Sequence, residues 1–207
     1  MRKYVVEFIG TFFLVLTVGL TVAKPGVGSF APLAIGFVLM VMIYAGGHIS
    51  GAHYNPAITL SALLAKKINI KMVPGYILAQ FLGAIFASLM FHTLRPDSFS
   101  IPADISWQPA LLAEMLFSFA LAYVILNVAC SKATAGNSYY GLAIGLTVTA
   151  GAYAVGGISG AVFNPAVGIG LHLMFLSKLS DFWIYLVGPI LGATYAAVVF
   201  NWIQKEE

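Results

Sequence analysis

Two short stretches of the sequence decide the fold: residues 46–57 read GGHISGAHYNPA, and residues 156–166 read GGISGAVFNPA. Both end in the triplet Asn-Pro-Ala, and the two asparagines, Asn55 and Asn164, lie 109 positions apart. Asparagine is a strong helix N-cap, and proline is favoured at the first helical position because its missing N–H costs nothing there. Each triplet therefore predicts the start of a helix.

The composition is that of a membrane protein. Of the 207 residues, 60% are apolar and 8% are charged, whereas soluble domains carry about 25% charged residues. No soluble core of this size would bury so much apolar surface. The net charge is +3, but the basic residues are scattered and form no basic face, which argues against a nucleic-acid partner. The single cysteine, Cys130, cannot form an internal disulfide.

Six segments are apolar and long enough to cross a bilayer, which takes about 20 residues. They are Tyr4–Ala23, Ala31–Gly47, Met72–Leu94, Pro109–Cys130, Tyr139–Val155 and Phe182–Trp202. The first begins after Arg2 and Lys3 but is too long for a signal peptide. Two further pieces, Pro56–Ala65 and Pro165–Leu176, are too short, because at ~1.5 Å per residue they reach about half of the ~30 Å hydrocarbon layer. We expect an all-α integral membrane protein.

The two halves of the chain repeat each other. The sequence Leu33–Gly36 recurs at residues 142–145, Tyr76 recurs as Tyr185, and Gly83 recurs as Gly192, all at the same spacing as the two triplets. Residues 1–207 are therefore expected to form a single domain of two repeats, about 1–95 and about 108–207. Around the triplets we interpret the two copies as differing in length by one residue, His48.

The repeat is expected to be inverted. Each half holds three spans, and after an odd number of spans the second half enters the membrane from the opposite side. The two short helices then dip in from opposite faces, and their N-terminal ends meet near the midplane. Irregular backbone at that depth must be packed in protein or line a watery cavity, and we expect the glycine-rich runs Gly46–Gly51 and Gly156–Gly160 to supply it.

The basic residues predict the orientation. With six spans both termini share one side, which receives seven basic residues: Arg2, Lys3, Lys66, Lys67, Lys71, Lys132 and Lys205. The other side receives three, Lys24, Arg95 and Lys178, together with Asp97, Asp104 and Asp181. The positive-inside bias therefore places both termini in the cytoplasm. Short termini and the lack of a targeting extension favour the plasma membrane.

The paired triplets predict a pore chemistry. Each helix N-terminus carries about half a positive charge, so two of them facing one pore repel cations, including hydronium. The side-chain amides of Asn55 and Asn164 can donate hydrogen bonds to a passing oxygen. A water molecule held by two donors is badly placed to receive a proton from its neighbour, so water passes while protons do not.

These features resemble the aquaporin, or major intrinsic protein, family. The resemblance is carried by both triplets (Asn55, Pro56, Ala57; Asn164, Pro165, Ala166), by HISGAHYN before the first, and by an acidic residue in each half: Glu7 in EFIGTFFLVL and Glu114 in EMLFSFALAYVIL. It covers nearly the whole chain. It implies six tilted helices plus two re-entrant half-helices, one pore per subunit, a homotetramer, and no cofactor or metal.

The resemblance also implies roles for the buried acidic residues. In the family such carboxylates brace the backbone of the two re-entrant loops, which is the role we expect for Glu7 and Glu114; a proton relay is the alternative, since an ionisable group inside a span is costly and usually functional. His48 and His53 are expected to hydrogen-bond within the first loop, a pH gate or metal site being the alternative. His92 and His172 have no partner at ligand spacing.

Family members narrow the pore at a second ring on the extracellular side. The resemblance assigns this selectivity ring to Ile35, Ala152, Ala161 and Val167. Most members have arginine at the last position, and strict water channels commonly have an aromatic residue and a histidine at the first two. This chain has none of these, which implies a wider and more apolar opening. Other side chains, such as Phe37, Tyr153 or Phe163, would narrow it by leaning in.

The sequence therefore predicts a passive channel for water and other small uncharged solutes, excluding ions and protons. The candidate solutes are ammonia, hydrogen peroxide, urea and, as the largest, glycerol; plant vacuolar members that also have valine after the triplet are associated with the first three. The alternatives are a secondary transporter with inverted repeats, a structural membrane-junction protein, and a membrane enzyme. No nucleophile–base pair or metal-ligand cluster in the sequence supports an enzyme.

Overall fold

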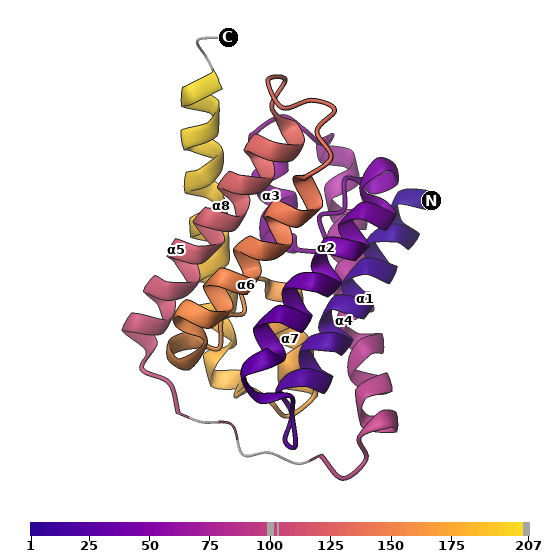
Figure 1. The fold of residues 1–207 in the computed structure, drawn as a ribbon, viewed down its shortest axis with the longest axis vertical. Coiled ribbons are helices and arrows are strands. Elements are labelled where there is room, and N and C mark those ends of the chain that lie inside the picture. The colour runs from indigo at the N-terminus through magenta and orange to yellow at the C-terminus, as the bar shows by residue number, and fades with distance from the viewer. Residues whose placement is uncertain (99–101, 103, 205–207) are drawn as a thin grey trace.

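The computed structural model describes residues 1–98, 102 and 104–204, and the fold of this part is all-helical (Figure 1). Its α-helices are α1 (Arg2–Val22), α2 (Ala31–Ser50), α3 (Pro56–Leu64), α4 (Val73–Leu94), α5 (Trp107–Ile125), α6 (Tyr140–Ser159), α7 (Pro165–Leu173) and α8 (Phe182–Ile203). A single π-helical turn, Leu126–Cys130, extends α5. Lys205, one of the basic residues used to predict the orientation, lies outside the described residues.

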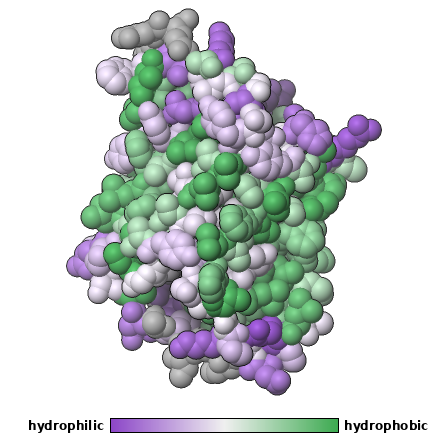
Figure 2. Space-filling model, in the orientation of Figure 1, coloured by the Kyte–Doolittle hydropathy of each residue, from purple (hydrophilic) through white to green (hydrophobic). Residues whose placement is uncertain are grey.

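The six predicted spans are confirmed in number and position. The described residues contain six helices that are long and apolar enough to cross a membrane, and they include α1, α2, α4, α5, α6 and α8. Apolar side chains cover the middle of the molecule and polar ones gather at its two ends (Figure 2). The helices α3 and α7 have nine residues each and do not cross. The start of α1 and the end of α8 lie toward the same end of the molecule (Figure 1).

The prediction for the glycine-rich runs was wrong in its bounds. Helix α2 continues to Ser50 and α6 to Ser159, so most of both runs is helical. Each helix ends where Gly51 and Gly160 adopt the left-handed conformation, with φ of 88° and 89°. Glycine is needed at that C-cap position because a Cβ is disfavoured there, whereas the earlier glycines fit an ordinary helix. The irregular segments are therefore residues 51–55 and 160–164.

The comparison of the two repeats had suggested that His48 is an inserted residue, but it is not. Helices α2 and α6 have 20 residues each, and every residue of α2 corresponds to the residue 109 positions later in α6. His48 therefore occupies the place of Gly157, in the last turn of its helix, and both positions are exposed.

The helices pack as two related halves. Helix α1 packs mainly on α4, and α5, its counterpart in the second half, packs on α8; α2 and α6 face each other between the halves. Each half-helix crosses to the other half: α3 packs chiefly on α8, and α7 on α4. This exchange brings the N-terminal ends of α3 and α7 together in the interior.

Glycines allow the close crossings of the long helices. A Cβ on Gly83 of α4 would lie 2.7 Å from the carbonyl oxygen of Phe8. A Cβ on its counterpart, Gly192 of α8, would lie closer still to the Met115 carbonyl oxygen of α5. Small residues at such crossings let two backbones approach and gain van der Waals contact, which is the main attraction between helices in lipid.

We expect Gly192→Val to destabilise the protein strongly. The added side chain meets backbone atoms of Met115 and Phe119, which cannot rotate away, and overpacking of this kind costs about 1–3 kcal/mol or more. The midpoint of thermal unfolding in detergent should fall by several degrees, with a loss of monodisperse protein. Gly157→Ala is the control, because a Cβ there meets open space. Equal unfolding midpoints for the two variants would contradict this account of the crossing.

Candidate functional site: the meeting point of the two half-helices

The two Asn-Pro-Ala triplets start the two half-helices, as predicted. The Oδ1 atom of Asn55 accepts a hydrogen bond from the Ala57 N–H at 2.8 Å, and Oδ1 of Asn164 accepts one from the Ala166 N–H at 2.9 Å. Both asparagines have extended backbone, and a proline occupies the first helical position of each half-helix. These are ordinary N-caps, each satisfying one of the free N–H groups of a helix start.

The same two side chains also tie the half-helices to each other. Nδ2 of Asn55 donates to the carbonyl oxygen of Phe163 at 2.9 Å, and Nδ2 of Asn164 donates to the carbonyl oxygen of Tyr54 at 2.9 Å. Each amide has a second N–H, and no protein acceptor for it is found in the described part of the chain. The positive ends of two helices and two free donors therefore meet at one place. The sequence did not predict these reciprocal links.

Glu7 holds the first irregular segment in place. One carboxylate oxygen accepts hydrogen bonds from the Ser50 hydroxyl (2.6 Å) and the His53 N–H (3.0 Å). The other accepts from the Tyr54 N–H (2.7 Å) and from Nε2 of Gln80 (2.8 Å). The side chain is fully buried, so these four donors replace the water that a carboxylate needs.

Glu114 holds the second irregular segment in the same way. It accepts from the Ser159 hydroxyl (2.6 Å), the Val162 N–H (2.9 Å) and the Phe163 N–H (2.6 Å). It is also fully buried. The position that corresponds to Gln80 is Pro189, which cannot donate, so the second carboxylate has one donor fewer. The sequence had not singled out Gln80 or the two serines, although the serine recurs before each triplet.

The two carboxylates also determine where the loop carbonyls point. In a trans peptide the N–H and C=O groups point in opposite directions. Because the N–H groups of His53 and Tyr54 turn toward Glu7, the carbonyl oxygens of Ala52 and His53 turn away from it, toward the cavity that these residues line. The second loop repeats this arrangement with Ala161 and Val162. Each irregular segment thus presents two acceptors beside the asparagine donors.

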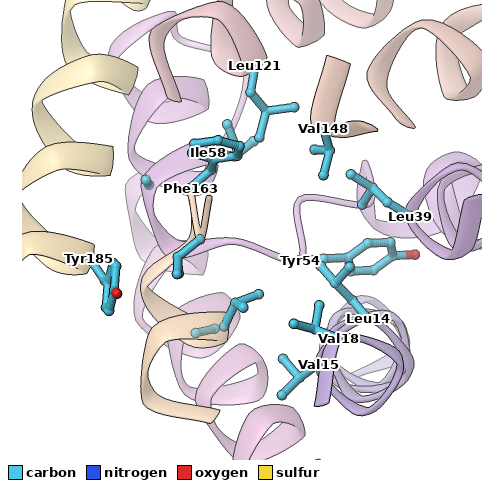
Figure 3. Packing of buried hydrophobic residues seen from close by; sticks show 14 of the residues in the cluster. Leu14, Val15, Val18, Leu39, Tyr54, Ile58, Leu121, Val148, Phe163 and Tyr185 are labelled. Carbon is cyan, nitrogen blue, oxygen red and sulfur yellow. The ribbon is translucent and has the colours of Figure 1, made fainter. Parts of the chain in front are cut away.

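A central cavity of about 370 Å³ surrounds this meeting point. Both asparagines line it, together with all four residues of the predicted selectivity ring, Ile35, Ala152, Ala161 and Val167. Most of the remaining lining is apolar. Leu14, Val18, Leu39, Leu121 and Val148, from four different helices, point toward a common space (Figure 3). The pathway is therefore mostly apolar, and its polar groups are the loop carbonyls, the asparagine amides and a few polar side chains, His53, Ser177 and Tyr185.

Two of the three aromatic side chains considered as narrowing the ring do not line the central cavity. Phe37 and Tyr153 are exposed on the outer surface, and the Tyr153 hydroxyl donates to the Ser29 carbonyl at 2.8 Å. Phe163 does line the cavity, but its ring is stacked on Phe117, with centroids 5.7 Å apart. The small side chains of the ring are therefore not replaced by larger neighbours.

An ion pair lies near the end of the molecule opposite the termini. Lys178 contacts the Asp104 carboxylate, and both line a surface pocket that shares Pro102, Leu176 and other residues with the central cavity. The Lys178 ammonium holds the pKa of the Asp104 carboxyl below its ordinary value. Asp104 is exposed and Lys178 is half-buried, so the pair stays in contact with solvent and adds little stability.

The histidines play different parts. We expected His53 to hydrogen-bond within the first loop, but its Nδ1 lies 3.1 Å from the hydroxyl of Thr59, which belongs to α3. His48 is exposed on α2, and the prediction that it hydrogen-bonds in the loop was wrong. His92 lies 2.9 Å from the carbonyl oxygen of Leu173, at the C-terminal end of α7. Asn201, 109 positions later, donates to the corresponding carbonyl of α3, a role that the sequence did not reveal.

Six spans, two capped half-helices meeting in the interior and a cavity at their junction define a membrane channel rather than an enzyme. A family model described as Major intrinsic protein matches residues 1–200, and the chain belongs to that family. Aquaporin NIP1-1 of Zea mays is 36% identical over 99% of this chain and 75% of its own. Nodulin-26 of Glycine max is 34% identical over 99% and 78%.

The solved structures agree on the fold. The aquaglyceroporin of Plasmodium falciparum superposes with a TM-score of 0.82, covering 99% of this chain and 97% of that one, at 23% sequence identity. At that identity the likeness speaks for the fold alone. It agrees with the arrangement of six spans and two half-helices described above.

Proposed function

We propose that this protein is a passive channel for water and other small uncharged solutes that excludes ions and protons. The observation that carries the proposal is the pair Asn55 and Asn164, each capping a half-helix, bonded across to the other loop and left with one N–H beside the central cavity. Membership of the major intrinsic protein family supports the same function. A transporter with inverted repeats is not favoured by the comparisons.

The conduction mechanism follows from the placement of donors and acceptors. A solute oxygen receives two hydrogen bonds from the asparagines, and the loop carbonyls of Ala52, His53, Ala161 and Val162 accept from its hydrogens on either side. These groups replace part of the hydration shell, while the apolar walls hold the solute weakly enough for it to leave. Cations are repelled, because the pathway passes two helix N-termini that each carry about half a positive charge.

The selectivity that we propose is broad. The ring of Ile35, Ala152, Ala161 and Val167 contains no charge and no side-chain donor, so water has no advantage there over a neutral solute with a carbon skeleton. We propose passage of at least one of ammonia, hydrogen peroxide, urea and glycerol, with ammonia and peroxide first and glycerol last because it is the largest.

Osmotic shrinkage of proteoliposomes tests the channel function. After an osmotic shock with an impermeant sugar, vesicles that contain the protein should shrink much faster than empty ones. Stopped-flow light scattering measures the rate. Shocks with glycerol and urea then report on solute passage. Shrinkage at the rate of empty vesicles would overturn the proposal, and flux that saturates or follows an ion gradient would favour a transporter.

Proton exclusion is a separate expected result. The helix N-termini disfavour hydronium, and a water molecule bound by both asparagines has its oxygen occupied by two donors. Vesicles with a pH gradient and valinomycin, which cancels the membrane potential, should keep the gradient about as long as protein-free controls. A pH-sensitive dye inside the vesicles measures it. Rapid collapse would mean that the centre does not exclude protons without an arginine in the ring.

The membrane, the orientation and the oligomeric state of the channel are also proposed. We propose a plasma-membrane protein with both termini in the cytoplasm, since Lys3 and Lys67 line a cavity at the end that carries the termini. We also propose that repeats 1–95 and 108–207 form a single domain and that four copies assemble, each with its own pore, as the family resemblance implies. Native mass spectrometry in detergent tests the tetramer.

A further inference from the structure

The central cavity meets a second cavity on the side of the termini. This second cavity has a volume of about 680 Å³. The linings of the two cavities have six residues in common: Ile43, Ala52, His53, Ile58, Ile125 and Ile144. The passage from one cavity to the other therefore runs between these side chains. We call the four isoleucines of this set the isoleucine collar.

The repeat relates the isoleucine collar to the extracellular side of the pore. Three of its members correspond, at a spacing of 109, to the ring: Ile144 to Ile35, Ile43 to Ala152, and Ile58 to Val167. The shared residue Ala52 likewise corresponds to Ala161 of the ring. The fourth isoleucine, Ile125 of α5, corresponds to Val18 of α1, at the spacing of 107 that also relates Glu114 to Glu7. The ring and the collar are thus the same positions on opposite sides of the asparagine pair.

The side chains of the collar are the larger ones. Where the ring has Ala152 and Val167, the collar has isoleucine, and where the extracellular side has Val18, the collar has Ile125. No pair has the larger side chain on the extracellular side. Because the two copies of the backbone place these positions alike, the added methyl and methylene groups leave the smaller opening at the collar.

The solvent exposure of the side chains also indicates that the collar is narrower than the ring. Although Ile43, Ile58 and Ile144 line both cavities, they are only 4%, 2% and 3% exposed. The fourth isoleucine, Ile125, is half-buried. Of the ring, Ile35, Ala152 and Ala161 are half-buried and Val167 is 4% exposed. Three of the four collar side chains are therefore almost inaccessible to solvent, whereas three of the four ring side chains are partly accessible.

The isoleucine collar also offers little to replace hydration. Among the six shared residues only His53 has a polar side chain, and its Nδ1 is already engaged with Thr59. A polar solute loses water there and keeps only the backbone carbonyls of Ala52 and His53, so the cost rises with the number of hydroxyl or amide groups that it carries.

We propose that the isoleucine collar, rather than the extracellular ring, sets the upper size limit for the solutes of this channel, with small polyols and amides such as glycerol and urea as the class at the limit. The inference rests on the proposed channel function. It makes Ile43, Ile58, Ile125 and Ile144 specificity-determining residues on the cytoplasmic side.

Exchanging the two sets of side chains tests this. The variant Ile43→Ala/Ile58→Val gives the collar the side chains of the ring, and we expect glycerol and urea permeability of proteoliposomes to rise about tenfold, the effect of removing roughly 1.4 kcal/mol from a barrier. The converse variant, Ala152→Ile/Val167→Ile, gives the ring the side chains of the collar. It should lower those permeabilities only about twofold, because a second equal barrier in series halves the flux.

The controls separate the possible failures. Val41→Ala, on the lipid-facing side of α2, should change nothing, and Ile43→Val is a milder variant should the double variant fail to reconstitute. If the wild type passes water but the collar variants leave solute flux unchanged, or if the converse variant abolishes that flux, the ring sets the limit and this inference is wrong. If the wild type does not pass water, the proposed function itself fails.

Discussion

Asn164→Leu should lower the osmotic water permeability of proteoliposomes about tenfold, since each 1.4 kcal/mol added to a barrier is a factor of ten in rate. The substitution removes the N–H that faces the cavity and the link to the Tyr54 carbonyl, and it puts an apolar branched side chain beside the pathway. It also removes the cap on Ala166, which costs about 1 kcal/mol of helix stability.

Two further variants separate the pore effect from loss of structure. Asn201→Leu removes an asparagine that serves the C-terminal end of the other half-helix, away from the central cavity, and should leave water flux near that of the wild type. Asn164→Asp keeps an acceptor for the Ala166 N–H but not the amide donor, so the fold should persist while flux falls. Unchanged flux in well-folded Asn164→Leu would mean that the asparagine pair does not control conduction.

The fold was predictable because its signals are strong and local. A span must be about 20 apolar residues long, and six such segments stand between short polar connections. An asparagine followed by proline at the start of an apolar piece too short to span is a helix start at membrane depth. The repeat then required the two helix starts to face each other, since three spans per half reverse its direction.

The missed details depend on contacts between distant parts of the chain. Nothing near Asn55 in the sequence indicates that its amide donates to Phe163, or that Gln80 completes the donors around Glu7. The end of α2 was placed too early because glycines weaken a helix on average. Here Gly46 packs against the Tyr54 hydroxyl and the Val6 side chain, where any larger residue would clash, so tertiary packing outweighs the helix propensity.

Some of the residues that line the pore were predicted from the sequence, and others were not. The resemblance to the family supplied the positions of the ring, but it did not reveal their relation to the isoleucine collar. Because α2 and α6 have equal lengths, the spacing of 109 pairs every ring residue with one nearer the end of the molecule that carries the termini. The sequence thus contained both sets of side chains, and the structure showed which of them is less accessible to solvent.

Val167→Arg combined with Ala152→His should convert the channel toward strict water selectivity. The two side chains restore to the ring the bulk, the positive charge and the donors that it lacks, and both positions line the central cavity. They are larger than the isoleucines of the collar and would make the ring the narrowest point. We expect urea and glycerol flux to fall about tenfold or more, while water flux falls much less, because a water molecule still fits and gains hydrogen bonds.

Paired shocks with sugar, urea and glycerol on the same vesicle preparation measure both fluxes. Tyr153→His is the matched control, since it places a histidine one residue along the same helix but on the exposed outer surface, and it should leave the ratio of solute to water flux unchanged. Should the double variant reduce both fluxes in equal proportion, it would be blocking the pore rather than filtering it. Should the wild type pass water but none of ammonia, peroxide, urea and glycerol, the broad selectivity proposed for this ring would be wrong, although the channel function would stand.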